Sequence, residues 1–273
     1  MKKHGPLFAA LFFISVAMIA YELDVMRVFT VTSWSSFGSM VISIALLGYG
    51  VAGTLLTFLQ KRFRENAAAW LQVTAICLGP VMAFSYILAQ QVPFNPVLLV
   101  SNWTQLFWIA VYYILYALPF FVGAMFIGIA FTVLSDGVHS LYFWNMAGSG
   151  IGGFIILGFM YLMPVKRLII PILLLATLGA FFIIFFRRPE EKNTSGQGAE
   201  LSRKRRTGIK EIRIRGLVFT AVACVAAIIP VLLWGGLKPS QFKSVELAKV
   251  TFSDLELMHS EHSPLGQMEV YKS

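Results

Sequence analysis

The chain has 273 residues, of which 58% are hydrophobic and 13% are charged, and its formal net charge is +9. Soluble globular domains carry about 25% charged residues. This chain therefore has too little polar surface to cover a water-soluble fold. The composition excludes an ordinary soluble enzyme and indicates a membrane protein.

Seven apolar stretches free of charged residues follow one another along the chain. An uncharged run of about 18 residues is long enough to cross a hydrocarbon core of about 30 Å as a helix. The stretches cover residues 6–21, 37–59, 68–89, 104–134, 140–163, 168–186 and 216–237. We predict an all-α membrane fold, a polytopic bundle of about seven transmembrane helices. The fourth stretch is too short for two spans and a turn, so one long span kinked at Pro119 is expected.

A polar cluster of Glu22, Asp24 and Arg27 follows the first stretch. Asp24 and Arg27 are three residues apart, so on a helix they share a face and can pair. The sequence favours an ion pair at the membrane surface that marks the end of the helix. The alternative is a span over 6–32 that holds the three residues as a buried polar cluster. Asn145 is the other polar candidate, and an interhelical hydrogen bond is favoured there over a substrate contact.

Lysine and arginine are concentrated in alternate loops. They stand at Lys2 and Lys3, at Lys61, Arg62 and Arg64, and at ten positions within 187–215, whereas residues 90–105 carry no charge. Because positive charge resists translocation, the N-terminus and the basic loop 187–215 are expected in the cytoplasm. Only Lys166 and Arg167 lie on the opposite side. Seven spans then bring residues 238–273 to the outside.

The basic loop also predicts the partners of the chain. Its middle, residues 189–202, is poor in apolar residues and predicts disorder. The basic residues at 203–215, just before the last span, predict contact with anionic lipid at about 1 kcal/mol per charge. Nucleic-acid binding is not expected, because the segment lacks stacking aromatic residues. The lipid bilayer and its anionic lipids are therefore the expected partners.

Two passages, 48–53 and 148–153, match the dinucleotide-binding spacing G-x-G-x-x-G. That fingerprint works only between a strand and a helix, with an acidic residue about 20 positions later, and both passages lie in apolar stretches. We predict instead that these small residues let neighbouring helices pack closely. Their similar placement in the second and fifth stretches also hints at a three-helix repeat, which transporters use. The glycines are Gly48, Gly50, Gly53, Gly148, Gly150, Gly152 and Gly153.

Residues 239–273 are polar and differ in texture from the rest of the chain. Leu255 with Leu257, and Met268 with Val270, alternate with polar residues on either side of a turn at 263–266, which predicts a β-hairpin. A lone hairpin is marginally stable in water, so this one is expected to open a larger domain. His259 and His262 would point to opposite faces of a strand, so no metal site is predicted.

Several short motifs resemble those of one family. They are LFFIS at 11–15 leading to Tyr21, Glu22 and Arg27, LLG at 46–48, LPFF at 118–121, and LY at 141–142 before the glycines. QFK at 241–243 and SPLGQMEV at 263–270 are similar to the strand that opens the family's soluble domain. The chain thus resembles bacterial membrane proteins in which a multi-pass module is fused to a spermidine synthase-like, S-adenosylmethionine-dependent methyltransferase-like domain. It departs at Asn145, where the family often has an acidic residue.

The resemblance implies a bacterial inner membrane and a link to polyamine chemistry. Soluble domains of this family bind S-adenosylmethionine or its decarboxylated form through a Gly-rich loop after the first strand, and place acidic residues on the amine substrate. Residues 238–273 would be only the start of such a domain. No catalytic, cofactor-binding or metal-binding residue is therefore expected in this chain. The cofactor is implied for a catalytic domain encoded downstream or separately.

Three classes of function are consistent with these features. The first is an integral membrane module that anchors or regulates an aminopropyl- or methyl-transferase-like domain, and whether the chain is an enzyme stays open. The second is a small transporter or half-transporter, and the third is a membrane scaffold. Seven spans would bring the hairpin outside, where S-adenosylmethionine is not expected. Either one stretch is re-entrant or the soluble domain does not use that cofactor.

Overall fold

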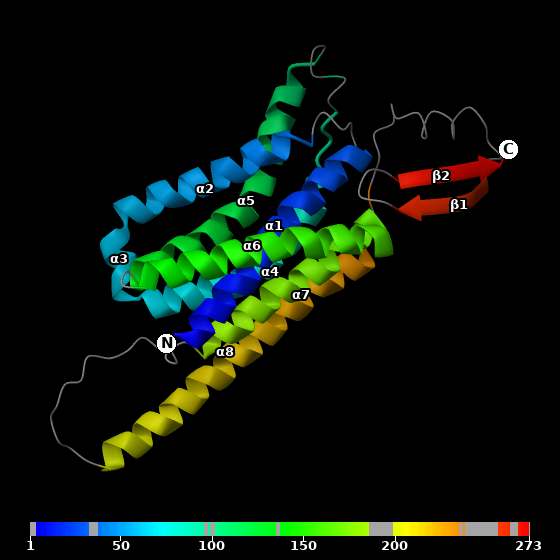
Figure 1. The fold of residues 1–273 in the computed structure, drawn as a ribbon. Coiled ribbons are helices and arrows are strands. Elements are labelled where there is room, and N and C mark those ends of the chain that lie inside the picture. Colours follow the sequence, from blue (N-terminus) through cyan, green and yellow to red (C-terminus); the bar gives the residue numbers. More distant parts are fainter. Residues whose placement is uncertain are drawn as a thin grey trace.

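The computed structural model describes residues 4–32, 38–95, 98, 102–134, 137–185, 199–234, 237, 256–262 and 267–272, with the backbone alone for 199–215. This part of the chain forms a helical bundle followed by a two-stranded sheet (Figure 1). The elements are α1 (Gly5–Thr32), α2 (Met40–Phe58), α3 (Gln60–Glu65), α4 (Ala67–Ala89), α5 (Thr104–Val133), α6 (Val138–Leu162), α7 (Val165–Ile184), α8 (Ala199–Leu233), β1 (Glu256–His262) and β2 (Gln267–Lys272).

Seven of the described helices are long and apolar enough to cross a membrane: α1, α2, α4, α5, α6, α7 and the part of α8 from Gly216. The predicted helical bundle is confirmed at this level, and most boundaries agree within three residues. The fourth stretch forms one helix, α5, with Pro119 inside it. The first helix continues to Thr32, so Asp24 and Arg27 lie within α1 and do not mark its end.

The basic segment departs from the prediction of a loop over 187–215. Residues 199–215 form the first half of α8, which runs without a break into the last apolar stretch. The segment has no proline and is rich in Ala, Glu, Leu, Lys and Arg, which are strong helix formers, and this propensity outweighs its low apolar content. The predicted disorder is therefore wrong for 199–202, while 186–198 lie outside the described residues.

The hairpin forms as predicted, with β1 and β2 antiparallel and an irregularity between Leu257 and His259. Residues 238–255 and the turn at 263–266 lie outside the described residues. The N-terminus, α3 and the beginning of α8 lie at one end of the bundle, and the hairpin lies at the other (Figure 1). The N-terminus and the hairpin therefore lie at opposite ends of the bundle.

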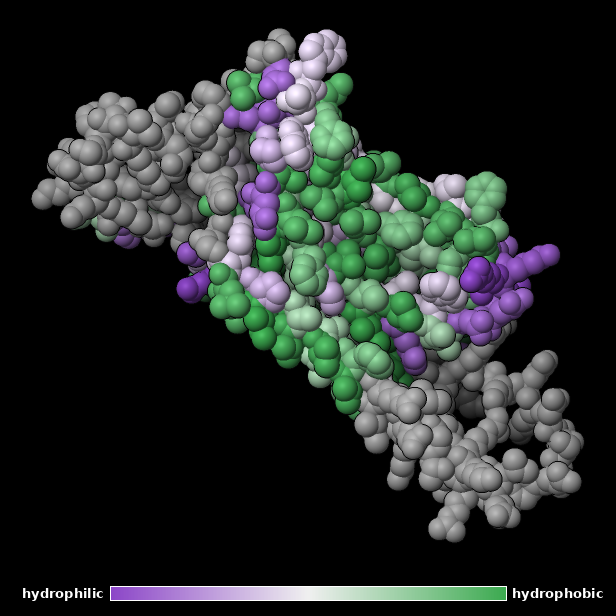
Figure 2. Space-filling model, turned by 180° about the vertical axis from the view of Figure 1, so that it is seen from behind, coloured by the Kyte–Doolittle hydropathy of each residue, from purple (hydrophilic) through white to green (hydrophobic). Residues whose placement is uncertain are grey.

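The surface between those two ends is hydrophobic. Figure 2 shows an apolar belt across the bundle, with hydrophilic residues gathered toward its ends. The large exposed side chains include Leu46, Phe58, Phe107, Phe154 and Leu162. An apolar surface of this extent is typical of contact with lipid rather than water.

Two groups of three helices pack in matching ways. α1 lies mainly against α6 and α7, while α5 lies mainly against α2 and α4. If α1, α2 and α4 correspond in order to α5, α6 and α7, the first helix of each group packs on the second and third helices of the other. α8 then covers α4 and α7 from outside the two groups.

Glycine contacts follow this correspondence residue by residue. A Cβ built on Gly48 of α2 would lie 2.8 Å from the carbonyl oxygen of Ala117 in α5. A Cβ built on Gly148 of α6 would lie 2.5 Å from the carbonyl oxygen of Phe12 in α1. The two accepting positions, 12 and 117, are 105 apart in the chain. The two close approaches are thus equivalent.

The third helix of each group also contacts positions of α5 and α1 that are 105 residues apart. Ser85 of α4 donates a hydrogen bond to the carbonyl oxygen of Leu115 in α5. A Cβ on Gly179 of α7 would lie 3.3 Å from the carbonyl oxygen of Ala10 in α1, and positions 10 and 115 are again 105 apart. A hydroxyl in one group therefore stands where the other group has a glycine.

The two groups also meet at equivalent residues. Met18 of α1 packs against Gly123 of α5, and these positions are 105 apart as well. A contact between equivalent positions is what a pseudo-twofold axis requires. Because each group has three helices long enough to cross, the second would traverse a membrane in the opposite direction, which is an inverted repeat.

Candidate functional site

The polar residues of α1 are buried at the end of the bundle away from its N-terminus. Asp24 has no exposed surface, and Arg27 is 5% exposed. Tyr21, one helical turn earlier, is also fully buried. They lie inside because α1 continues for about three more turns after Tyr21 and packs within the bundle.

Tyrosines from two neighbouring helices surround this turn of α1. Tyr86 of α4 and Tyr116 of α5 are fully buried, and both Tyr21 and Tyr86 lie near Asp24. Tyr112 of α5 meets Tyr116 with ring centroids 5.0 Å apart. The site is thus one carboxyl group in an aromatic, hydroxyl-bearing environment built from α1, α4 and α5.

Several polar atoms of this cluster have no hydrogen-bond partner among the described residues. They are both carboxyl oxygens of Asp24 and the hydroxyl of Tyr86. The predicted ion pair between Asp24 and Arg27 is not found in the described part of the chain, and Arg27 has an interaction of its own. A buried polar group without a partner costs about 1–3 kcal/mol, so such groups are retained mainly where they serve a function.

The neighbouring polar groups are paired. The side-chain amide of Gln90 donates to the hydroxyl of Tyr116 at 3.1 Å, and the backbone amide of Asn95 donates to Oε1 of Gln105 at 2.9 Å. Gln105 is 7% exposed, so this bond lies within the bundle. The first bond joins the C-terminal end of α4 to α5, and the second holds the segment after α4 against the beginning of α5.

Glu22 and Asn145 do not join Asp24. Glu22 is half-buried and faces Tyr49 of α2. Asn145 accepts a hydrogen bond from Oγ of Ser15 at 2.7 Å, an interhelical bond between α1 and α6. Ser15 lies nine residues before Asp24, about 13 Å along the helix. Glu22 therefore lies apart from the rest of the polar cluster predicted on the first helix, and Asn145 lies in a third place.

The predicted packing glycines also divide. Gly48, Gly148 and Gly152 face the backbone of a neighbouring helix, and a Cβ on Gly152 would lie 2.6 Å from the carbonyl oxygen of Val16. The prediction is wrong for the others, which have nothing within 4 Å of such a Cβ: Gly50, Gly53, Gly150 and Gly153. Residues two or five positions away along a helix point to a different face, so the spacing G-x-G-x-x-G places two of its three glycines outward.

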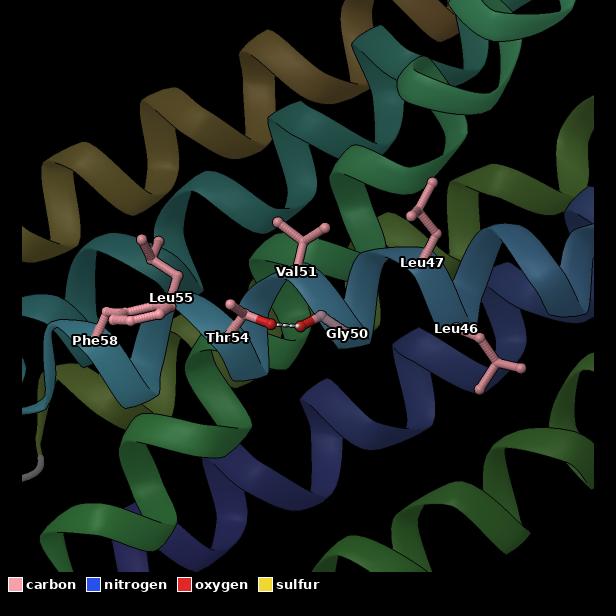
Figure 3. A pocket seen from close by; sticks show the side chains of 7 residues that line it. All are labelled: Leu46, Leu47, Gly50, Val51, Thr54, Leu55 and Phe58. Atoms are coloured by element: carbon pink, nitrogen blue, oxygen red, sulfur yellow. Dashed lines mark hydrogen bonds between the residues drawn. The ribbon is translucent and has the colours of Figure 1, made fainter.

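The outward face of α2 carries a shallow groove of about 480 Å³ (Figure 3). Its lining is apolar apart from Thr54, whose hydroxyl donates to the carbonyl oxygen of Gly50 at 2.9 Å. Gly50 thus contributes to a lipid-facing groove and not to a helix contact. The lining residues are Leu46, Leu47, Gly50, Val51, Thr54, Leu55 and Phe58.

The described residues contain no group of three or more His, Cys, Asp or Glu that could hold a metal ion. His259 instead lies 3.3 Å from the carboxylate of Glu261 on the exposed hairpin. Comparisons with models of protein families, with curated proteins and with solved structures find no match.

Sequence reasoning missed the tyrosine part of the site. Tyr86, Tyr112 and Tyr116 lie in apolar stretches, where a tyrosine is usually interpreted as an anchor at the membrane interface. The available signal was their spacing: Tyr112 and Tyr116 are four residues apart and share one face of a helix. Their convergence with Asp24 depends on the packing of α4 and α5 against each other, which a single sequence does not report.

Proposed function

We propose that this chain is the integral membrane module of a spermidine synthase-like protein, which anchors or regulates an aminopropyl- or methyl-transferase-like domain. The motifs along α1, α2, α5 and α6 and the similarity at 241–243 and 263–270 support this proposal. Any cofactor would be held by the catalytic domain; with seven crossings that domain lies outside, so S-adenosylmethionine or its decarboxylated form would serve there only if one stretch were re-entrant. The membrane would be a bacterial inner membrane.

The hairpin is the observation that carries the proposal. Two strands alone are marginally stable in water, and the exposed residues of this pair include apolar Met258, Met268 and Val270. Further strands or a covering helix would bury these side chains and pair the free edges. A Rossmann-like catalytic domain supplies both elements.

A cell-fractionation experiment tests anchoring. In cells of the source organism, transfer of a labelled methyl or aminopropyl group should be found in the membrane fraction and should leave that fraction when the gene for this chain is deleted. Equal membrane-bound activity with and without the chain would contradict the proposal. The purified chain alone is expected to yield no labelled product, because carboxylates on an open hairpin cannot exclude water or fix geometry.

The proposed orientation has the N-terminus in the cytoplasm. The exposed basic residues of α3, Lys61, Arg62 and Arg64, lie at the same end of the bundle as the N-terminus and the beginning of α8 (Figure 1). Positive charge at one end is the usual signature of the cytoplasmic side. The basic residues at 203–215 would then contact anionic lipid of the inner leaflet.

A second candidate, a small transporter, is favoured by two further observations. One is the correspondence between the two groups of three helices, which is the architecture of many secondary transporters. The other is the unpaired Asp24 among tyrosines, since ionisable groups within a bundle commonly lie on substrate or ion pathways. Reconstituted protein would be tested for uptake of labelled cationic amines, and uptake that survives Asp24→Asn would count against this candidate.

A further inference from the structure

A second hollow lies at the corner where α2 turns through α3 into α4. Its volume is about 330 Å³, within the range of small-molecule sites. Phe63 of α3 and Trp70 of α4 form one wall, with their rings in edge contact at 5.0 Å. α5 closes the other side. The lining residues are Leu55, Leu59, Arg62, Phe63, Trp70, Thr74, Phe121, Val122 and Met125.

Arg62 is the charged member of this lining. It is exposed, and its guanidinium has no ion pair or hydrogen bond with any residue that the structure describes. Its neighbours Lys61 and Arg64 are also exposed, while Glu65 is the acidic residue of α3. The mouth of an apolar pocket is therefore basic, and no acidic residue in the described part of the chain pairs with Arg62.

The pocket adjoins the groove on the outward face of α2. Leu55 lines both hollows, and Figure 3 shows it beside Phe58 at one end of the groove. The groove follows α2 from there toward Leu46 across the apolar belt. The apolar pocket and the apolar groove therefore lie next to each other, close to Arg62.

We propose that this corner binds one anionic phospholipid. Its phosphate contacts Arg62, one acyl chain enters the pocket against Phe63 and Val122, and the other lies along the groove of α2. A diacyl lipid fits because it carries two apolar chains and one negative charge from a single headgroup. Arg62 supplies charge complementarity, since a guanidinium binds phosphate with paired hydrogen bonds. A zwitterionic lipid would bring a positive group to the same basic helix and bind less well.

Lipid titration of the full chain in mild detergent tests the site. Binding of dioleoyl phosphatidylglycerol and of dioleoyl phosphatidylcholine would be measured by native mass spectrometry. Phosphatidylglycerol should bind more tightly, and Arg62→Gln should weaken it about fivefold, which corresponds to about 1 kcal/mol for one basic residue. Lys61→Gln, on the same helix but outside the lining, is the matched control and should change binding by less than about twofold.

Variants of the apolar wall separate the pocket from general charge attraction. Val122→Phe fills the pocket and should reduce phosphatidylglycerol binding, while Ile114→Phe places the same ring on the lipid-exposed face of α5 and should not. Equal losses in the Arg62 and Lys61 variants would overturn the proposal, as would equal binding of the two lipids. Displacement of phosphatidylglycerol by equimolar oleate would overturn it too, by assigning the pocket to a free fatty acid.

Discussion

The four glycines of α6 within 148–153 differ in whether a neighbouring helix packs against them. Gly148 and Gly152 are four residues apart on the face that meets α1, where carbonyl oxygens of α1 leave no room for a side chain. Gly150 and Gly153 face open space. Small residues at a helix crossing let the backbones approach, so only the first pair stabilises the bundle.

Gly152→Leu should therefore lower the thermal unfolding temperature in detergent, whereas Gly153→Leu should leave it nearly unchanged. The expected loss is about 1–3 kcal/mol or more, because the side chain would displace α6 from Val16. Differential scanning fluorimetry of both variants measures the contrast. Similar shifts in the two proteins would show that these helices do not cross at Gly152.

Asp24 and Asn145 are both polar residues of the bundle, but only one of them is bonded. Asp24→Leu should raise the free energy of unfolding by about 1–3 kcal/mol, because it removes an unpaired buried group. Asn145→Leu should lower that free energy by about 0.6 kcal/mol, because it breaks the bond to Ser15. The two variants would be compared by thermal unfolding. A destabilising Asp24→Leu would mean that the carboxyl group has a structural partner in the folded protein.

Among the elements, the sequence predicted best those whose apolar composition alone determines that they form helices. Long charge-free runs predicted the membrane helices well, since a helix is the form in which a single apolar segment satisfies its own backbone in lipid. The sequence was least informative for the first half of α8, because that basic, polar segment was interpreted as a loop. Charge predicts exposure to water but does not exclude a helix, and 199–215 are helical.

The continuity of α8 leads to a prediction about its basic half. Replacing Arg203, Lys204, Arg205 and Arg206 by glutamine should weaken the orientation signal and release a fraction of molecules with inverted topology, while the number of spans stays the same. Protease added to intact cells should cut at 189–202 only in that inverted fraction. Cleavage of the parent protein from outside would show that the assigned orientation is wrong.

For the whole molecule, the arrangement of helices was only partly predictable. The glycine motifs hinted at a repeat of three helices, but the correspondence rests on contacts between α1 and α6 and between α2 and α5, which join residues about 70 to 135 positions apart. Local periodicity does not report such contacts. The site around Asp24 was missed for the same reason, since Tyr86 of α4 lies near Asp24 and Tyr116 of α5 lies near Tyr21 and Tyr86.

A seven-span bundle would place its basic end and its C-terminal hairpin on opposite sides of the membrane. Fusions of a fluorescent protein that matures only in the cytoplasm, and of a phosphatase active only outside, would be placed before Met1 and after Ser273. We predict a fluorescent N-terminal fusion and an active C-terminal phosphatase, because seven crossings bring the hairpin to the outside. A fluorescent fusion after Ser273 would contradict it and would show that one of the seven helices does not cross.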